Sequence, residues 1–377
     1  MAHNLYERWM YSWETRLTTR DSNRVVRPFD WGLEWTRSWP CVNGNFPRAE
    51  TPASAERFLH DINQEVVSNS DSFFSYQTPS DFRLERRRVE LFHTGSAPPK
   101  ARHANLSEEA DFLRFTSPVK TPYPENNLAN ARWFPAPGKR AEKKKRAIVI
   151  LPQWNSDALS HNAICRAANH FGVSALRLSM PYHDIRMPDE LQRADYAVSA
   201  NVARTIDAAR QAIIDIRCCL DWLEQQGYSD LGVMGTSLGS CYAFIASAHD
   251  PRLRVNIFNF ASQYFADVVW TGQSTRHIRA GMEPAIDLER LRRAWLAISP
   301  ISFFDKFAAQ DKKSLLIYAK YDLTFLPEFS RQVAQAFKER NVDHKTVALP
   351  SGHYTTGEWP FKYIDGYHIV NFLRKAF

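Results

Sequence analysis

The 377-residue sequence has no apolar run long enough to span a membrane. Its first eight residues, MAHNLYER, also lack the apolar core of a secretory signal. These two absences argue against stable membrane insertion and against export. We therefore predict a cytoplasmic protein.

Cysteine is scarce and is not arranged for pairing. There are five cysteines, an odd number, and Cys218 and Cys219 are adjacent. The sequence has no C-x-x-C spacing of the kind that holds metal ions. We therefore predict buried free thiols, no disulfide framework and no metal site.

The sequence also lacks a concentrated basic patch, although its formal net charge is +7. The densest basic run, residues 139–146, falls between two expected strands and is predicted to be an exposed loop. Nucleic-acid binding needs basic residues clustered across one face, so we predict no nucleic-acid partner. The contents of 44% hydrophobic and 24% charged residues are typical of a soluble globular protein.

The most informative feature that is present is the pentapeptide Gly235-Thr236-Ser237-Leu238-Gly239. It follows the apolar run at residues 231–234 and precedes a stretch of small and apolar residues at 241–246, which suits a buried helix. In a sharp strand-to-helix turn, the residues two before and two after the serine must lack bulk, and the strain holds the hydroxyl clear of the sheet. The pattern predicts that Ser237 is a nucleophile.

Two further candidates follow in the chain. Asp322 comes just after an expected strand at residues 314–319, and His353 lies in a turn after another expected strand at 344–349. A serine hydroxyl needs a base to take its proton, and a carboxylate fixes the tautomer of that base. Asp305 is the alternative acid, but no strand precedes it, so Asp322 is preferred.

These three motifs, in the order Ser, Asp, His, resemble the α/β-hydrolase superfamily over roughly residues 110–377. The resemblance implies Ser237 as nucleophile, Asp322 as acid and His353 as base. It implies a carboxylic-ester hydrolase that forms an acyl-enzyme on a small-molecule ester and needs no cofactor. The same residues would also suit a peptidase, an amidase or an acyltransferase, and a hydrolase scaffold can serve as a binding protein.

An ester hydrolase also needs two backbone N–H groups aimed at the oxyanion. The resemblance implies Leu238 as one donor, at the start of the helix after Ser237. The other should come from the loop after the expected strand 147–151, where the His-Gly signature of many esterases is absent. Pro152 has no N–H, which leaves Gln153, slightly preferred, or Trp154. Trp154 could also cover the substrate pocket or simply pack in the core.

Apolar strands alternate with helical stretches along most of the chain. Helices are expected at 158–171 and 202–223, and a strand between them at 173–178. This alternation predicts an α/β fold in which helices cover both faces of a mostly parallel sheet. The catalytic domain is predicted to span residues 111–377.

Residues 1–110 are predicted to be an extension of that domain. They hold five of the eleven tryptophans, at positions 9, 13, 31, 35 and 39, which indicates packing onto something large. The hydrolase body is the preferred partner. A second copy of the chain or a membrane surface are the alternatives, and a homo-oligomer is therefore possible.

An aromatic and arginine-rich insertion is predicted at residues 263–300. It is either a helical lid that selects substrates or a peripheral helical pair. If it is a lid, Tyr264 and Arg276 are candidate substrate contacts, with the arginines pairing an acidic group. His183 follows the strand 173–178 and either faces the same pocket or belongs to a simple turn.

Overall fold

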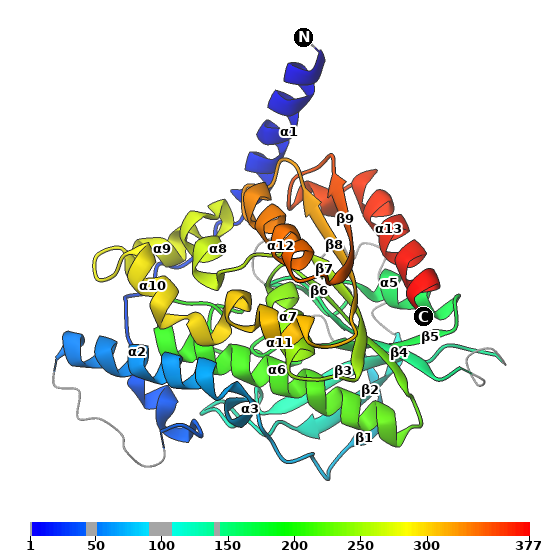
Figure 1. Cartoon of the computed structure of the whole chain (residues 1–377), viewed down its shortest axis with the longest axis horizontal. Coiled ribbons are helices and arrows are strands. Elements are labelled where there is room, and N and C mark those ends of the chain that lie inside the picture. Colours follow the sequence, from blue (N-terminus) through cyan, green and yellow to red (C-terminus); the bar gives the residue numbers. More distant parts are fainter. Residues whose placement is uncertain (1, 43–50, 90–107, 139–143) are drawn as a thin grey trace.

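A computed structural model describes residues 2–42, 51–89, 108–138 and 144–377. A single sheet of nine strands, in the order β1-β2-β3-β5-β4-β6-β7-β8-β9, organises the chain (Figure 1). The strands are β1 (Arg83–Arg88), β2 (Glu109–Thr116), β3 (Leu128–Phe134), β4 (Arg146–Leu151), β5 (Val173–Leu178), β6 (Asp230–Thr236), β7 (Leu253–Asn259), β8 (Lys313–Ala319) and β9 (Asp343–Leu349).

The longer helices lie between and around these strands. They are α1 (Ala2–Thr18), α2 (Pro52–Ser68), α3 (Ser70–Phe73), α5 (Asn162–Asn169), α6 (Val202–Gln225), α7 (Leu238–Ala248), α8 (Phe265–Thr271), α9 (Arg276–Met282), α10 (Leu288–Ala294), α11 (Phe304–Ala308), α12 (Pro327–Glu339) and α13 (Phe361–Ala376). Short helical turns are η1 (Leu33–Ser38), η3 (Asp184–Arg186), η4 (Gln273–Thr275), η5 (Leu296–Ile298), η6 (Pro300–Phe303) and η7 (Thr355–Gly357).

The sheet is mostly parallel, which confirms the predicted fold class. Strands β4 to β9 pair in parallel, and β1, β2 and β3 join one edge through antiparallel pairs. In parallel strands the carboxyl ends share one edge, so the loops after β4, β6, β8 and β9 open on the same side of the sheet. Strand β1 lies within the predicted extension and pairs with β2, so part of that segment belongs to the sheet.

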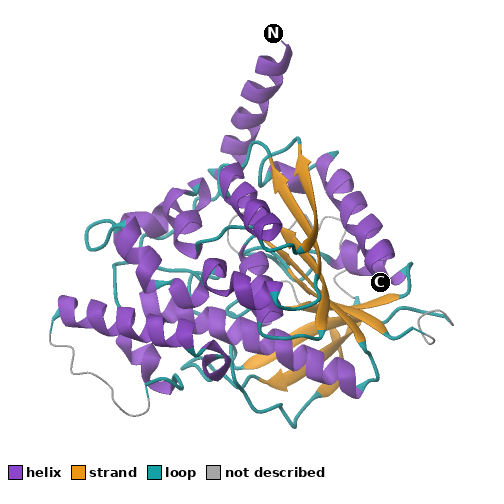
Figure 2. Ribbon diagram, viewed as in Figure 1, coloured by secondary structure: helices purple, strands orange, loops and turns teal. Residues whose placement is uncertain are grey.

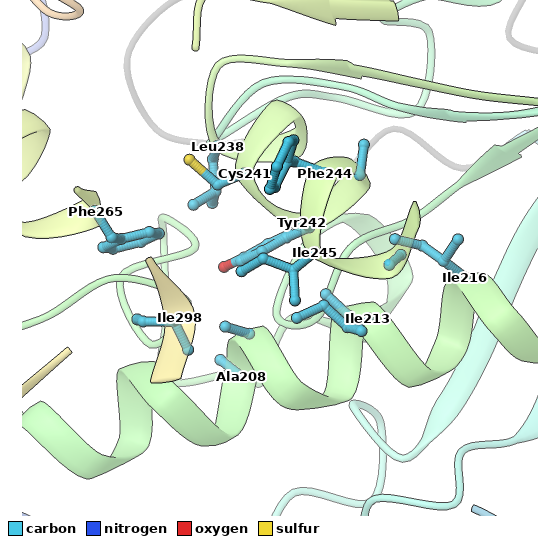
Figure 3. Close-up of a cluster of buried hydrophobic side chains, with 14 of the residues drawn as sticks. Ala208, Ile213, Ile216, Leu238, Cys241, Tyr242, Phe244, Ile245, Phe265 and Ile298 are labelled. Carbon is cyan, nitrogen blue, oxygen red and sulfur yellow. The ribbon is translucent and has the colours of Figure 1, made fainter. Parts of the chain in front are cut away.

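Helices cover both faces of the sheet (Figure 2). Alternate residues of β4 point to opposite sides: Val149 joins the larger core with α6 and α7, whereas Ile148 and Ile150 join a second core with α5 and α13. Helix α7 is buried along its whole length. Figure 3 shows its Tyr242 and Ile245 next to side chains of α6.

Several predicted elements match the structure closely, and one differs. The strand predicted at 173–178 is β5, and the periodic stripe at 202–223 lies in α6. The helix expected from 158 begins only at Asn162, because the Asp157 carboxylate accepts the amides of Leu159 and Ser160 and holds them in a turn.

Cysteines and the basic run can also be compared with their predictions. All five cysteines are free, and four are buried. Of the basic run, residues 139–143 lie outside the described residues, and Lys144 and Lys145 are exposed. Arg146 is buried at the start of β4, so it is not part of an exposed loop.

Among the described helices, none has the length and apolar character needed to cross a bilayer.

The N-terminal segment spreads along the hydrolase body. Trp31 and Trp39 lie in the larger core, and the Trp39 indole donates to Asp207 on α6 over 2.9 Å. Helix α1 stands out from the body, with the N-terminus at its outer end (Figure 1). Trp9 on α1 is half-exposed, so the predicted packing of the tryptophans onto the body does not extend to this residue.

Candidate active site

The turn from β6 into α7 has the strained geometry that the pentapeptide predicts. Ser237 has φ 57° and ψ −120°, a positive-φ conformation that side-chain-bearing residues rarely adopt. A Cβ on Gly235 would lie 2.1 Å from the Gly239 carbonyl oxygen, and one on Gly239 would lie 2.7 Å from the Pro152 oxygen. Only glycine fits at either position, because backbone atoms of neighbouring segments lie where a side chain would begin.

The structure brings Ser237, His353 and Asp322 into one chain of hydrogen bonds. Nε2 of His353 lies 3.0 Å from Oγ of Ser237, and Nδ1 lies 2.9 Å from a carboxylate oxygen of Asp322. Ser237 and Asp322 are buried, and the His353 side chain is 10% exposed. This is the arrangement in which a serine, a base and an acid act together.

Asp322 is held in place by its own loop. The second carboxylate oxygen of Asp322 accepts the amides of Thr324 and Phe325 over 2.7 and 2.8 Å. Asp305, the alternative acid, is 89% exposed on α11 and pairs with Arg340. Of the two aspartates, only Asp322 is in contact with His353.

The electrostatic surroundings favour a charged imidazolium at His353. Burial of the ring works against the charge. The Asp322 carboxylate, helped by the more distant Glu14, outweighs this effect and raises the pKa of His353 above its ordinary value. The phenyl ring of Phe325 stacks on the imidazole, with ring centres 5.4 Å apart. The His353 ring thus contacts Asp322 at its edge and Phe325 on one of its faces.

Candidate oxyanion donors lie beside the serine. The Leu238 amide is the first of α7, where no helical acceptor exists for it. Gly239 brings α7 against the loop after β4, which carries Gln153 and Trp154. Within the described part of the chain, neither of their amides has a hydrogen-bond acceptor, so both remain candidates. The next amide, that of Asn155, is excluded because it donates to His183.

His183 is buried and contacts this loop. Its Nδ1 lies 2.8 Å from the Pro181 carbonyl, and its Nε2 accepts the Asn155 amide over 3.0 Å. Burial lowers the pKa of His183 to about 4, so the ring is neutral and can accept that bond. His183 thus makes two backbone contacts and supports the loop that carries Gln153 and Trp154.

The Trp154 ring meets the insertion. Its indole N–H donates to the Ala194 carbonyl over 2.9 Å, and its ring stacks on His277 of α9 at 5.9 Å with an interplanar angle of 4°. Both His277 nitrogens are buried without a partner among the described residues, and burial lowers the pKa of this imidazole to about 4. His277 was not predicted from the sequence.

The insertion is also joined to the loop after β8, which carries Asp322. The Gln273 amide donates to the Leu323 carbonyl over 2.7 Å, and the hydroxyls of Ser274 and Thr324 lie 3.1 Å apart. The insertion therefore touches the loops after both β4 and β8. It is joined to the loops that carry the candidate site.

Most of the arginines that the sequence offered for an acidic substrate have partners already. Arg279 pairs with Glu283, Arg290 with Glu56 and Arg292 with Asp267. The guanidinium of Arg292 also lies 5.0 Å from the centre of the Tyr264 ring. Arg276, by contrast, is exposed on α9.

One buried carboxylate next to the site was missed by sequence reasoning. Glu14 of α1 is fully buried, and its two oxygens accept the amides of Tyr354 and Thr355, each over 2.9 Å. The signal was a glutamate placed four residues after Met10 and eight after Tyr6, on one face of an aromatic helix. The described residues contain no group of three or more histidine, cysteine, aspartate or glutamate side chains suited to a metal ion.

The sheet order, the strained serine turn and the loops at the carboxyl edge define an α/β-hydrolase fold, and the chain is similar to known proteins of this class. The family model described as alpha/beta hydrolase domain containing 18 matches residues 113–294. That match includes Ser237 and ends before Asp322 and His353. No curated protein matches the sequence.

Solved structures show the same fold at low sequence identity. Acetyl xylan esterase 1 from Thermoanaerobacterium sp. JW/SL YS485 is 14% identical, with 91% of this chain and 99% of that chain covered and a TM-score of 0.53. The acetyl xylan esterase from Paenibacillus sp. R4 is 11% identical, with 95% and 98% covered and a TM-score of 0.54. A puromycin-hydrolyzing peptidase from Mycobacterium tuberculosis is 11% identical, with 72% and 44% covered and a TM-score of 0.50.

Proposed function

We propose that the chain is a serine hydrolase that cleaves a carboxylic ester through an acyl-enzyme. The observation that carries this proposal is the contact of Ser237 with His353, and of His353 with Asp322, at a strained turn between a strand and a helix. The α/β-hydrolase fold and the esterases among the similar structures support it.

In the first step, Oγ of Ser237 attacks the ester carbonyl carbon while Nε2 of His353 takes its proton. The carbonyl oxygen becomes an oxyanion, stabilised by the Leu238 amide and by Gln153 or Trp154. The C–O bond to the alcohol then breaks, and His353 gives its proton to the leaving oxygen. In the second step, a water deprotonated by His353 attacks the acyl group, the acid leaves and Ser237 regains its proton.

The insertion is proposed to select the substrate. It contacts both the Gln153–Trp154 loop and the acid loop, through the His277 ring and through Gln273 and Ser274. An element in that position can restrict the groups attached to the ester without touching the reacting atoms.

The test combines a fluorophosphonate probe with p-nitrophenyl esters of increasing chain length and aminoacyl anilides. The probe should label Ser237, and Ser237→Ala should lose both label and esterase activity. His353→Ala and Asp322→Ala should each lower kcat by about 10⁴-fold. Because the triad acts as a unit, the double variant should lose little more than the worse single one.

Asp305→Ala is the matched control, since this aspartate is 89% exposed and pairs with Arg340 rather than with His353. It should keep wild-type activity. Faster turnover of anilides than of esters would favour a peptidase or amidase, and acyl transfer to added alcohols would favour an acyltransferase. Folded wild-type protein that takes no label would leave the binding-protein alternative.

A further inference from the structure

The loop that carries His353 is held by a helix from the opposite end of the chain. His353 lies between β9 and η7, in a loop of only a few residues. Helix α1 packs against η7 and against η4 of the insertion. Contacts with α1, together with the preceding strand β9, therefore fix the position of this loop.

Three residues of α1, spaced four apart, make these contacts. The Tyr6 hydroxyl donates to the Pro350 carbonyl. Met10 places its sulfur 3.5 Å from the Thr355 hydroxyl. Glu14, the innermost of the three, accepts the amides of Tyr354 and Thr355. Because residues four apart share one face of a helix, a single face of α1 follows the loop from before His353 to after it.

The Glu14 carboxylate fits this place tightly. Its atoms leave no room for a side chain on Gly352, where a Cβ would lie 2.4 Å from the carboxylate carbon. The Gly352 amide in turn donates to the Thr355 hydroxyl over 2.6 Å. Residues on both sides of His353 are thus fixed by one connected set of hydrogen bonds that ends on Glu14.

A buried carboxylate is costly unless its charge is compensated. Burial raises the pKa of Glu14 above its ordinary value. The two backbone amides and His353 lower the pKa in part, and Asp322 adds to the rise. Burial raises the pKa of the neighbouring Tyr354, and the charged groups that act on its side chain are Arg24, Asp21 and Arg193. The charges of Asp322 and His353 act on Glu14, and the Glu14 carboxylate in turn raises the pKa of His353.

We propose that Glu14 is a positioning residue for the catalytic histidine, fixing the imidazole between Ser237 and Asp322 through the two amides that follow it. This inference rests on the proposed function, because it needs His353 to be the base. Glu14 does not touch the reacting atoms and acts only through the loop. Its negative charge also favours the imidazolium that forms when His353 takes the serine proton.

Two variants of similar shape distinguish the effect of the Glu14 side-chain length from the effect of its charge. Glu14→Gln keeps the length but replaces one acceptor with an NH₂ group and removes the charge. Glu14→Asp keeps the charge but falls short of the amides by one methylene. With p-nitrophenyl acetate, and with kcat expressed per fluorophosphonate-labelled site, we expect Glu14→Asp to lower kcat by roughly 10- to 100-fold with little change in KM. We expect Glu14→Gln to lower kcat and also to move the apparent pKa of kcat/KM downward.

Thr18→Ala is the matched control. This residue is buried on the same helix, and among the described residues its hydroxyl donates to the backbone carbonyls of Glu14 and Thr15 and does not contact the Glu14 carboxylate. Thr18→Ala should keep the wild-type kcat and pH profile. Unchanged kcat per labelled site and an unchanged pH profile in both Glu14 variants would overturn the positioning role, even if their stability fell. An active Ser237→Ala variant would instead overturn the proposed function.

Discussion

Replacing Gly239 by alanine tests the link between the serine turn and the loop after β4. The added Cβ would lie 2.7 Å from the Pro152 oxygen and 2.8 Å from the Leu151 oxygen, about 0.7 Å inside the 3.4 Å at which ordinary contact begins. Both obstacles are backbone atoms, so α7 or the loop must move. Overpacking of this kind costs roughly 1–3 kcal/mol of unfolding free energy.

The larger effect should be on catalysis. The same loop carries Gln153 and Trp154, and Leu238 lies between Ser237 and the substituted residue. A shift of this size misaligns at least one oxyanion donor, and loss of one donor lowers kcat by about 10²- to 10³-fold. We therefore expect kcat for p-nitrophenyl acetate to fall roughly 100-fold while KM stays nearly unchanged, because the donors act mainly on the transition state.

Gly366→Ala is the control for this substitution. It adds the same methyl group on α13, where the nearest atom, Cδ1 of Ile164, is an ordinary 3.7 Å away. Its kcat should match the wild type, and urea unfolding should show no loss of stability. Wild-type kcat in folded Gly239→Ala protein would refute the argument that this close approach sets the oxyanion geometry.

Two further predictions concern the base and the insertion. The value of kcat/KM should rise with pH through an apparent pKa above about 6.5. The reason is that the raised pKa of His353 keeps the ring protonated, and unable to act as a base, up to a higher pH. A profile flat from pH 5 to 9 would count against a histidine base. His277→Ala should change the ranking of long against short p-nitrophenyl esters, because it opens space beside Trp154. Glu289 is 71% exposed on α10, so Glu289→Ala should leave the ranking unchanged. An unchanged ranking in both variants would contradict a selecting role for the insertion.

The parallel sheet was predictable because its strands are apolar on both faces, a pattern that survives in sequence as runs such as 147–151. The serine turn was predictable because its geometry admits only glycine two residues away on each side. Strand β1 was harder to assign to the sheet, since its charged residues at 85–88 pair across an exposed edge. Its membership depends on partners that lie farther along the chain.

Glu14 and His277 could not be found in the same way. Each is defined by what it touches in space: Glu14 by amides 340 and 341 residues away, and His277 by a ring on another loop. His183 shows the converse, since its place after a central strand suits a pocket residue equally well. Only the two backbone bonds to its ring nitrogens show that it is structural.

The contact between α1 and the His353 loop also has a consequence for synthesis of the protein. Glu14 and Tyr354 are 340 residues apart, so at about 5–20 residues per second roughly 20–70 s separate their appearance on the ribosome. During that interval Glu14 lacks its two amide partners, although η4 of the insertion, which also packs against α1, is made earlier. The loop that carries His353 is made long after the serine turn, so the nascent chain holds Ser237 in its turn well before His353 can reach it.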